Sequence, residues 1–332
     1  MVNLTELRVN QMRAHILKTL RESGNHVSGE RLSKQLGISR VSVWKHIRSL
    51  KENGYVIEAS PRGYRLVSSP DLLLPYEFPG LEQRIHYFPE IGSTMDAARE
   101  LAKKGVGEGT IVIAEAQIRG RGRLSREWLS PEGGIYFTLI LRPSISPAYA
   151  PRINLMSSVA VAATIRKLFR LNAELKWPND VLIEGRKVCG ILAEMDAEMD
   201  VVNFVNVGIG INANTSVPQF EKTATSLKDM LGREISRKEF LSVVLVEINR
   251  RQARLMKANL LEEWKELSGT LNKYVRILSP GEVIVGRAID IDTTGALIIR
   301  KRNGSLKKAM AGDCIHLREE APDTDMGAVS HQ

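Results

Sequence analysis

The sequence predicts a multidomain α+β protein with three folded parts. Its 332 residues are 43% hydrophobic, so the chain is long and apolar enough for about two or three domains. The hydrophobic pattern changes twice, from helical periodicity to alternating strands and helices, and then to short strands separated by turns. We expect a winged helix-turn-helix domain over 1–67, a linker over 68–80, a central mixed α/β sheet domain over 81–271, a small β-barrel over 272–320 and a disordered tail over 321–332.

Three segments before residue 55 have apolar residues at helical spacing. Ser28 and Ser39 precede the second and third segments and are of the residue type that caps a helix N-terminus. The turn at Gly37 joins these two helices too tightly for an ordinary bundle, which gives a helix-turn-helix pattern. The apolar faces contain Met12, Ile16 and Leu20, then Leu32 and Leu36, then Val43, Ile47 and Leu50.

The third of these helices and the segment after it favour binding to DNA. The stretch "YVIEASPRGYRLV" predicts two short strands about a turn from Ser60 to Gly63, which makes a basic wing. Residues 1–66 carry 12 Lys and Arg against 5 Asp and Glu, which leaves a net charge of +7 and favours a polyanion as partner. A small helical dimerisation module is the alternative, but it leaves the charge and the wing tip unexplained. The predicted DNA-binding residues are Arg40, Ser42, Lys45, Arg48 and Arg62, and Trp44 lies on the same outer face.

The middle of the chain alternates strands with helices. Several strands follow one another through glycine-containing turns, which favours a mixed sheet over a doubly wound parallel sheet. The candidate strands are "TIVIAEA", "IYFTLIL", "AELKW", "DVLIEGRKVCGILAEM" and "VNFVNVGIGIN", and the candidate helices are 94–104, 152–170 and 236–258.

The segments on either side of the central domain lack its alternation of strands and helices. "SSPDLLLPYEFPG", residues 68–80, contains three prolines and no period, so it predicts a linker. From about residue 272, short β runs separated by Pro-Gly, Thr-Gly and Asn-Gly turns predict a small barrel.

Cysteine content and hydropathy indicate a cytoplasmic protein. Cys189 and Cys314 have no neighbours that would make a metal site or a disulfide framework, so both are predicted to be reduced thiols. No apolar segment is long enough to span a bilayer, and the first residues lack the apolar centre of a signal peptide. We therefore expect no membrane partner.

The stretch "QIRGRGRLSREW", residues 117–128, holds four arginines and two glycines without apolar periodicity. Such a segment can be a solvated turn, a nucleic-acid patch or a loop that folds over phosphate. A Walker phosphate loop would need Gly-Lys-Ser/Thr leading into a helix, and an arginine-glycine RNA-binding tract would normally repeat; neither is found here. The glycines allow close approach to a ligand, and the arginines suit carboxylate or phosphate oxygens.

Two further clusters carry polar groups or glycines near this stretch. "KWPNDVLIEGRKVCGILAE", residues 176–194, places Lys176, Asn179, Asp180 and Lys187 in a strand-turn-strand unit. "VGIGIN", residues 207–212, places glycines where a backbone must approach a ring or a neighbouring strand. Taken alone, each cluster also has an ordinary explanation as a turn, a solvated lysine or relief of crowding within a sheet.

Together with "GSTMDAA", residues 92–98, these motifs resemble those of the biotin–protein ligases. The order is Ser-Thr, Gln-x-x-Gly-Arg-Gly-Arg with a later Trp, Lys-Trp-Pro-Asn-Asp, Arg-Lys-x-x-Gly-Ile-Leu and Gly-Ile-Gly-Ile-Asn, and it extends from Ser93 to Asn212. With a winged helix in front, the chain resembles the bifunctional biotin ligase and biotin operon repressor family. That family joins a DNA-binding domain to a ligase domain and an SH3-like barrel.

The resemblance implies a two-step reaction. The biotin carboxylate attacks the α-phosphate of ATP to give biotinyl-5′-AMP, which then acylates a lysine of a biotin carboxyl carrier protein. Both steps need concentrated positive charge. Biotin and ATP are the implied small molecules, Mg2+ is implied on the ATP phosphates, and no metal site made by the protein is implied.

The resemblance also implies roles for individual residues. Asp180 is the candidate to orient or deprotonate the acceptor lysine, and it joins Lys187 and Arg123 as the implied catalytic residues. The implied biotin-binding residues are Ser93, Thr94, Met95, Gln117, Arg121, Gly122, Arg123 and Lys187. The implied nucleotide-binding residues are Arg121, Arg123, Trp128 and Asn212.

The family's regulation further implies operator DNA and a ligand-induced homodimer as partners. A flexible Gly-Arg loop that orders over the adenylate would exclude water and present a dimerisation surface. Two positions depart from the family's usual pattern. Met95 stands where an asparagine is common, and Leu124 and Ser125 leave the loop with one charge and one glycine fewer.

Two alternatives keep a related fold. One is a biotin-sensing transcription factor without ligase activity, which is disfavoured because Arg121, Arg123, Asp180 and Lys187 are all present. The other is a lipoate or octanoate ligase. Those enzymes resemble this chain less around "GRGR" and "KWPND", and a winged helix in front of them would be unusual.

Overall fold

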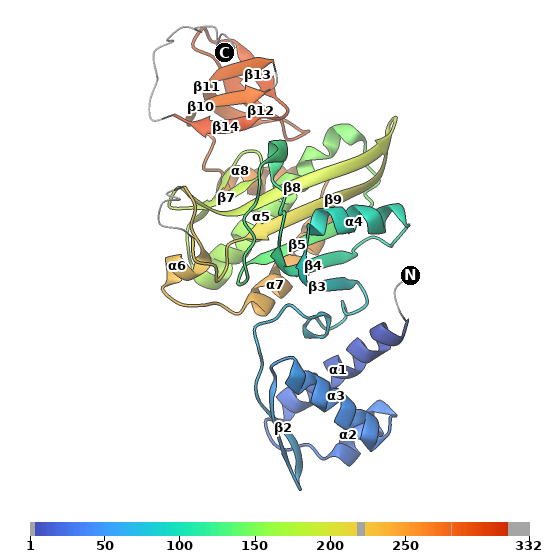
Figure 1. Ribbon diagram of the computed structural model, residues 1–332. Coiled ribbons are helices and arrows are strands. Elements are labelled where there is room, and N and C mark those ends of the chain that lie inside the picture. The colour runs from blue at the N-terminus through green and yellow to red at the C-terminus, as the bar shows by residue number, and fades with distance from the viewer. Residues whose placement is uncertain (1–3, 218–222, 280, 318–332) are drawn as a thin grey trace.

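The computed structural model describes residues 4–217, 223–279 and 281–317. Three folded parts follow one another in space as they do in the sequence (Figure 1). The N-terminal helices lie at one end, the seven-stranded sheet lies in the middle, and a five-stranded sheet lies at the other end. The tail predicted over 321–332 falls outside the described residues.

The first part has the predicted three helices and hairpin. Both predicted caps are confirmed, because Ser28 Oγ accepts a hydrogen bond from Arg31 N, and Ser39 Oγ accepts one from Ser42 N. Gly37 ends the second helix in the left-handed conformation at φ +63°. The elements are α1 (Leu4–Ser23), α2 (Gly29–Leu36), α3 (Arg40–Glu52), β1 (Val56–Ser60) and β2 (Gly63–Ser68). Their shared core contains Ile16, Leu20, Leu32, Val43, Ile47 and Leu50.

The wing formed by β1 and β2 is anchored to the helices. Val27 and Tyr64 exchange two backbone hydrogen bonds, each 2.9 Å long. Gly63, at φ +123°, starts β2 so close to this pair that an added Cβ would lie 2.2 Å from the Val27 carbonyl oxygen. A side chain at residue 63 would therefore push the wing away from the helices.

The central sheet is mixed, as predicted. β3 (Ile85–Ile91) pairs with β4 (Ile111–Gln117) in parallel, and the other neighbours are antiparallel in the order β3-β4-β5-β9-β8-β7-β6. The remaining strands are β5 (Ile135–Leu141), β6 (Ala173–Lys176), β7 (Asp180–Ile183), β8 (Arg186–Glu198) and β9 (Val201–Ile211). All five candidate stretches are strands, with 180–195 divided between β7 and β8. β3 was not predicted, because Pro89 interrupts it; a proline is tolerated there because β3 is an edge strand.

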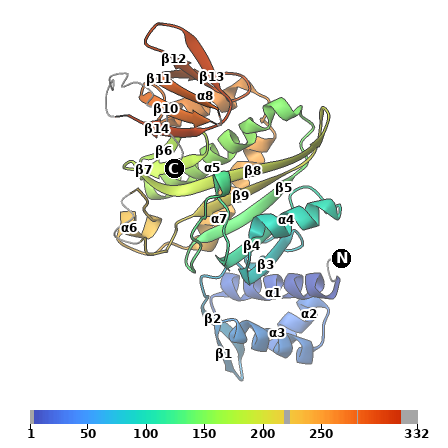
Figure 2. The ribbon, with the colours of Figure 1, turned by 45° about the horizontal axis from the view of Figure 1, so that its top comes forward.

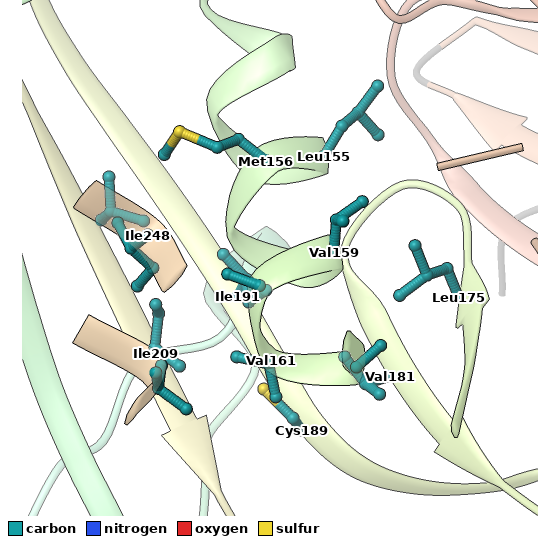
Figure 3. Packing of buried hydrophobic residues seen from close by; sticks show 14 of the residues in the cluster. Leu155, Met156, Val159, Val161, Leu175, Val181, Cys189, Ile191, Ile209 and Ile248 are labelled. Carbon is teal, nitrogen blue, oxygen red and sulfur yellow. The ribbon is translucent and has the colours of Figure 1, made fainter. Parts of the chain in front are cut away.

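Helices cover both faces of this sheet. α4 (Thr94–Lys103) covers one face, and α5 (Pro151–Phe169), α7 (Arg237–Gln252) and α8 (Ala258–Leu267) cover the other. Figure 3 shows Ile191 of β8 and Ile209 of β9 among the side chains of α5. The helix predicted over 236–258 ends at Gln252, and the short α6 (Leu227–Leu231) and α8 were not predicted. No glycine or proline marks the break between α7 and α8, so the sequence pattern predicted that the helix would continue through this break.

The C-terminal part is an antiparallel sheet in the order β13-β12-β11-β10-β14. Its edge strands, β13 and β14, do not pair with each other, so the closed barrel expected from the sequence is not found among residues 274–279 and 281–316. Both edge strands are only four residues long, which leaves little backbone for a closing ladder. The strands are β10 (Tyr274–Ser279), β11 (Glu282–Ile291), β12 (Leu297–Arg300), β13 (Leu306–Ala309) and β14 (Asp313–His316).

The segment over 68–80 is packed, although it has little regular structure. Residues 73–78 are all buried and include the short 3-10 helix η1 (Pro75–Glu77). Leu74 and Tyr76 belong to the core of the N-terminal part, whereas Leu73 and Phe78 belong to the core of the central part. At this junction η1 packs against both α1 and β3, and Figure 2 shows α1 on the β3 side of the central sheet. The segment therefore contributes side chains to two cores.

Neither cysteine forms a disulfide, as the sequence predicts. Cys189 of β8 is buried in the core of the central part, and Cys314 is buried in β14, where burial raises the pKa of its thiol to about 12. Within the described part of the chain, no helix is both long enough and apolar enough to cross a membrane.

Candidate active site

A cavity lies between the arginine-rich loop and the strands β8 and β9. Asp313 of the C-terminal sheet closes one side of it. The structure brings nine of the predicted residues from three separate stretches of sequence to this cavity: Thr94, Met95, Gln117, Arg121, Gly122, Arg123, Trp128, Asp180 and Lys187. Ser93 and Asn212 do not line it. Ser93 is buried just before α4, and the Asn212 amide donates to the Thr225 carbonyl oxygen at 3.0 Å.

Glycines form the floor of the cavity. Because strand side chains alternate between faces, Ile191 and Ile209 point into the core while their neighbours Gly190, Gly208 and Gly210 face the cavity. The Trp128 indole lies against Gly190 and Gly210, and an added Cβ at residue 210 would lie 2.4 Å from Trp128 Nε1. These glycines leave the space for an aromatic ring that "VGIGIN" indicated.

The Met95 thioether lies against Gly208, as the Trp128 indole lies against Gly190 and Gly210. An added Cβ at residue 208 would lie 2.6 Å from Met95 Sδ. Met95 is buried on the first turn of α4, so its contact with the site is made through packing, and no amide is present at this position. Met95, which stands where the family commonly has an asparagine, therefore gives the cavity an apolar wall.

A directional chain of hydrogen bonds fixes the amide of Gln117. Thr138 Oγ1 donates to Thr94 Oγ1 at 2.9 Å, and Thr94 donates to Gln117 Oε1 from both its hydroxyl and its backbone N–H. Gln117 Nε2 then donates to Ser130 Oγ at 2.9 Å, and Ser130 donates to the Trp128 carbonyl oxygen. Both acceptor positions of the Gln117 oxygen are filled, so only its second amide N–H is left for a ligand.

The arginine-rich loop is held down by groups of the protein. Arg121 forms ion pairs with Glu194 of β8 at 2.6 Å and with Asp96 of α4 at 2.9 Å. Glu194 also binds Arg99. Leu124 and Ser125 adopt left-handed backbone conformations, with φ of +53° and +58°. The loop therefore has a defined path despite having one glycine fewer than the family's usual pattern.

Arg123 and Arg126 connect the loop to the C-terminal sheet. The Arg123 guanidinium donates to the Gly312 carbonyl oxygen at 3.2 Å and to Asn179 Oδ1 at 3.1 Å. Arg126 forms an ion pair with Asp313. Burial lowers the pKa of Arg123 from its ordinary value, and the neighbouring Asp313 carboxylate opposes this shift. The third part of the chain thereby reaches the cavity.

Lys187 and Asp180 face each other across the strand pair β7 and β8. The Lys187 Nζ atom lies 2.7 Å from Asp180 Oδ1 and 5.2 Å from the centre of the Trp128 ring. Both side chains are only partly exposed. A cation and a carboxylate are thus held together beside an aromatic face, where a ligand's phosphate would compete for the lysine.

The predicted DNA-binding residues lie on α3 and at the tip of the wing. Arg40, Lys45, Arg48 and Arg62 are exposed. Ser42 is engaged in the helix cap, since its hydroxyl lies 3.0 Å from that of Ser39. Arg48 pairs with Glu52 at 3.0 Å, so part of its charge is already neutralised.

Several residues of the site were not predicted from the sequence. Glu194 and Asn179 lie within the quoted motifs, but nothing in their spacing indicated that they bind the loop arginines. Gly312 and Asp313 belong to the C-terminal part and carry no local signal for this role. Thr138 lies within the buried strand β5 and Ser130 precedes that strand, and neither hydroxyl residue carries a sequence signal for this role.

Three families match successive parts of the chain. The "HTH domain" family matches residues 13–65. The "Biotin/lipoate A/B protein ligase family" matches residues 87–212. The "Biotin protein ligase C terminal domain" family matches residues 270–317. These matches coincide with the three folded parts and contain every predicted site residue.

Individual proteins match over most of the chain. "Bifunctional ligase/repressor BirA" of Bacillus subtilis (strain 168) is 36% identical over 318 residues, covering 91% of this chain and 98% of the relative. The protein of the same name from Escherichia coli (strain K12) is 29% identical, covering 91% of this chain and 96% of the relative. The structure of "Biotin protein ligase from Aquifex aeolicus in complex with biotin and ATP" superposes with a TM-score of 0.61 at 29% identity, covering 71% of this chain and 99% of that one. The chain therefore belongs to the bifunctional ligase/repressor family of biotin protein ligases.

Proposed function

We propose that this chain is an ATP-dependent biotin–protein ligase that also acts as a biotin-responsive DNA-binding repressor. Membership of the family supports both activities. The observation that carries the ligase assignment is the cavity itself, where Arg121, Arg123 and Lys187 converge beside Trp128 and the fixed amide of Gln117.

The first step joins biotin to AMP. A biotin carboxylate oxygen attacks the α-phosphorus of ATP, the bond from that phosphorus to the bridging oxygen breaks, and pyrophosphate leaves. Arg121, Arg123 and Lys187 supply the positive charge that lets two anions meet. Mg2+ enters as part of the ATP substrate, bound to its phosphates. Within the described residues, no group of three or more His, Cys, Asp and Glu side chains is placed to hold a metal ion.

The hydrogen-bond chain behind Gln117 suits the ureido ring of biotin. This ring has one carbonyl acceptor and two N–H donors. The free amide N–H of Gln117 can donate to the carbonyl. The buried Ser93 hydroxyl has no partner among the described atoms but lies outside the cavity lining, so it can accept from or donate to the ring only after a local rearrangement. Thr94 keeps one lone pair as an acceptor, and Met95 gives the ring an apolar wall.

The nucleotide would lie on the Trp128 side of the cavity. The Trp128 Nε1 atom is buried without a partner in the described structure, so it can donate to a ligand. Asn212 contributes only if its amide leaves the Thr225 carbonyl oxygen. This requirement makes Asn212 a residue that acts after a local rearrangement.

The second step transfers biotin to a lysine of a biotin carboxyl carrier protein. The lysine amine attacks the carbonyl carbon of the mixed anhydride, the bond from that carbon to the phosphate oxygen breaks, and AMP leaves. The amine must lose a proton, and Asp180 is the carboxylate placed to accept it. Asp180 becomes free to do so when Lys187 turns from it to the substrate phosphate.

The arginine-rich loop acts as the lid of the site. Its arginines already bind protein carboxylates and carbonyl groups, and the substrate anions would replace these partners. A loaded lid that presents a dimerisation surface would place two copies of α3 on two operator half-sites. Operator DNA and the ligand-induced homodimer are therefore parts of the proposal.

We further propose the finer organisation of the chain. The domains are 1–67, 81–271 and 272–320, and 68–80 connects the first two. The C-terminal sheet is SH3-like: only three residues separate β13 from β14, so these edge strands must lie near each other and the sheet must curl. Cysteines that are free and buried agree with a cytoplasmic location.

One experiment separates this proposal from its alternatives. The purified protein is given ATP, a biotin carboxyl carrier domain and, in turn, biotin, lipoate or octanoate, and pyrophosphate exchange and acylation of the carrier are measured. We expect both signals with biotin alone. Biotin binding without exchange would indicate a sensor that lacks ligase activity, and turnover of lipoate or octanoate would indicate the related ligases.

A further inference from the structure

The outer face of α3 carries two large apolar side chains among its cations. Val41 is 64% exposed and Trp44 is 50% exposed. Lys45 and Arg48 continue the same exposed face at helical spacing, on the side opposite the buried face of α3. The exposed stripe is therefore half apolar and half basic.

The apolar half of this stripe lies in the first two turns of α3, which is the second helix of the helix-turn-helix. α3 begins at Arg40, capped by Ser39, so Val41 and Trp44 occupy its first two turns. In helix-turn-helix proteins the N-terminal residues of the second helix contact the base edges. The Arg48 guanidinium lies 5.8 Å from the Trp44 ring centre, which favours an outward position of the indole.

Val41 and Trp44 form one wall of a groove. The opposite wall comes from the wing and includes Ser60, Gly63 and Tyr64. The wing is attached to the helices by the paired backbones of Val27 and Tyr64, so the width of the groove is set by the fold. The groove is a formed surface of the N-terminal part.

The charges around the groove select a nucleic acid as its occupant. The side chains of Arg40, Lys45 and Arg62 are exposed and make no ion pair with any residue in the described part of the chain. An apolar protein surface would leave these cations unpaired at its edge, whereas DNA phosphates would neutralise them. DNA therefore satisfies both components of the stripe, provided that the base edges offer apolar atoms.

Thymine supplies such atoms. In the major groove its C5-methyl group is the one apolar substituent that a base pair presents, and apolar side chains recognise it. We propose that Val41 and Trp44 recognise thymine methyl groups in the major groove, so that operator half-sites carry thymine where they face the first turns of α3. This inference rests on the proposed DNA binding.

The experiment removes the methyl groups without changing the protein. A duplex is selected by the biotin- and ATP-loaded protein from a library with a random 20-base-pair core, and each thymine of the selected sequence is then replaced singly by deoxyuridine. Loss of a contacted methyl should weaken binding about fourfold, which is the value for one buried apolar carbon. The salt dependence of binding should not change, because no phosphate contact is lost.

Matched variants locate the contact. Val41→Ala and Trp44→Ala should bind the thymine duplex more weakly than the parent and should lose sensitivity to deoxyuridine at the positions that each contacts. Val246→Ala is the control, because Val246 is 65% exposed on α7 of the central domain. It should respond to deoxyuridine as the parent does.

The outcomes are distinguishable. Failure to select any duplex would overturn the proposed DNA binding. Selection of a duplex whose affinity is unchanged by deoxyuridine at every position would leave DNA binding in place and overturn the assignment of Val41 and Trp44. Because that test uses the parent protein, it does not depend on whether Trp44→Ala folds.

Discussion

The two junctions of the central domain use charged residues in different ways. At the N-terminal junction, Arg237 is 6% exposed and binds Asp71 at 2.9 Å and Glu115 at 2.8 Å. At the C-terminal junction, Arg126 is 66% exposed where it binds Asp313. Arg237 and Glu115 are enclosed by protein and only the Asp71 carboxylate is partly exposed, whereas Arg126 and Asp313 line the cavity.

This difference indicates which ion pairs can exchange a protein partner for a substrate phosphate during the reaction. Removing one partner of a buried ion pair leaves an uncompensated charge, whereas an exposed pair contributes little. Glu77, at 2% exposure, adds to the buried set by binding Arg21 of α1 at 2.7 Å and the hydroxyl of Tyr55. We infer that the N-terminal junction keeps one arrangement, while the C-terminal junction is able to exchange protein partners for substrate phosphate.

The largest effect is expected from breaking the buried junction. Arg237→Met would leave Asp71 and Glu115 unpaired and should lower the free energy of unfolding by about 3–5 kcal/mol. Urea denaturation measures this change, and Arg233→Met, at an exposed arginine nearby, serves as the control. A loss below about 1 kcal/mol for Arg237→Met would remove the contrast between the junctions.

Two truncations sharpen the role of the segment over 68–80. A chain that begins at Ser69 keeps the contacts of Asp71 with Arg237 and of Leu73 N with Glu115, so it should fold and form biotinyl-AMP without the N-terminal helices. A chain that begins at Gly80 loses both contacts and should be less stable by about 3 kcal/mol.

Pyrophosphate exchange and urea denaturation of the two truncated chains give the result. A folded Ser69 chain without exchange would show that the N-terminal helices belong to the ligase. Equal stability of both chains would show that this segment is only a linker.

The next effect is on the rate of adenylation and concerns Lys187, which lies on a strand of the central sheet. Lys187 lies on β8 and not in the loop, so it supplies charge without first having to move with the lid. Lys187→Ala should slow adenylation by about a hundredfold, the effect of losing one strong charge-stabilising contact. Single-turnover formation of biotinyl-AMP measures it. An unchanged rate would assign the charge stabilisation to the arginines alone.

A smaller effect, on the retention of biotinyl-AMP, is expected at the C-terminal junction. Arg123→Gly removes the contacts with Gly312 and Asn179, so the lid should open more readily and biotinyl-AMP should escape about tenfold faster while adenylation continues. The free adenylate should then label bystander proteins. Arg119→Gly is the matched control, because Arg119 is exposed in the same loop and does not line the cavity.

Adenylate release is followed by spin filtration, together with labelling of an added bystander protein. If Arg123→Gly and Arg119→Gly retain the adenylate equally, the loop is not the lid. Its arginines would then be residues of a solvated turn.

The smallest effect is the pH dependence of the C-terminal junction. His316 Nε2 lies 3.0 Å from Thr270 Oγ1, and burial lowers the pKa of His316 from 6.5 to about 4. Between these values the unfolded chain binds a proton that the folded chain does not, so stability should fall as the pH falls from 6.5 to 4. The loss should stay below about 1 kcal/mol at pH 5, because the ring is partly exposed.

Thermal unfolding of the parent and of His316→Gln at pH 7 and pH 5 measures this difference. The variant should lose less stability than the parent between the two pH values. An equal loss in both proteins would assign the acid sensitivity to other groups.

Local structure followed from the sequence wherever local interactions decide it. The caps at Ser28 and Ser39, the turn at Gly37 and the hairpin before Gly63 were predicted because each depends on residues a few positions apart. β3 was not predicted because a strand that contains a proline is possible only at the edge of a sheet, and the sequence does not show which strand is at the edge. α8 was not predicted because no glycine or proline marks the break before it, so only packing determines where that helix begins.

The sequence by itself determined the three folded parts, the outer face of α3 and the motifs that carry the cations and glycines of the cavity. Only the tertiary structure decided that Glu194 holds Arg121, that Gly312 holds Arg123, and that residues 73–78 are buried between two cores. The physical reason is range. Capping and periodicity act within a few residues, whereas a guanidinium binds whichever carboxylate or carbonyl oxygen the fold brings within about 3 Å, and sequence spacing does not encode that partner.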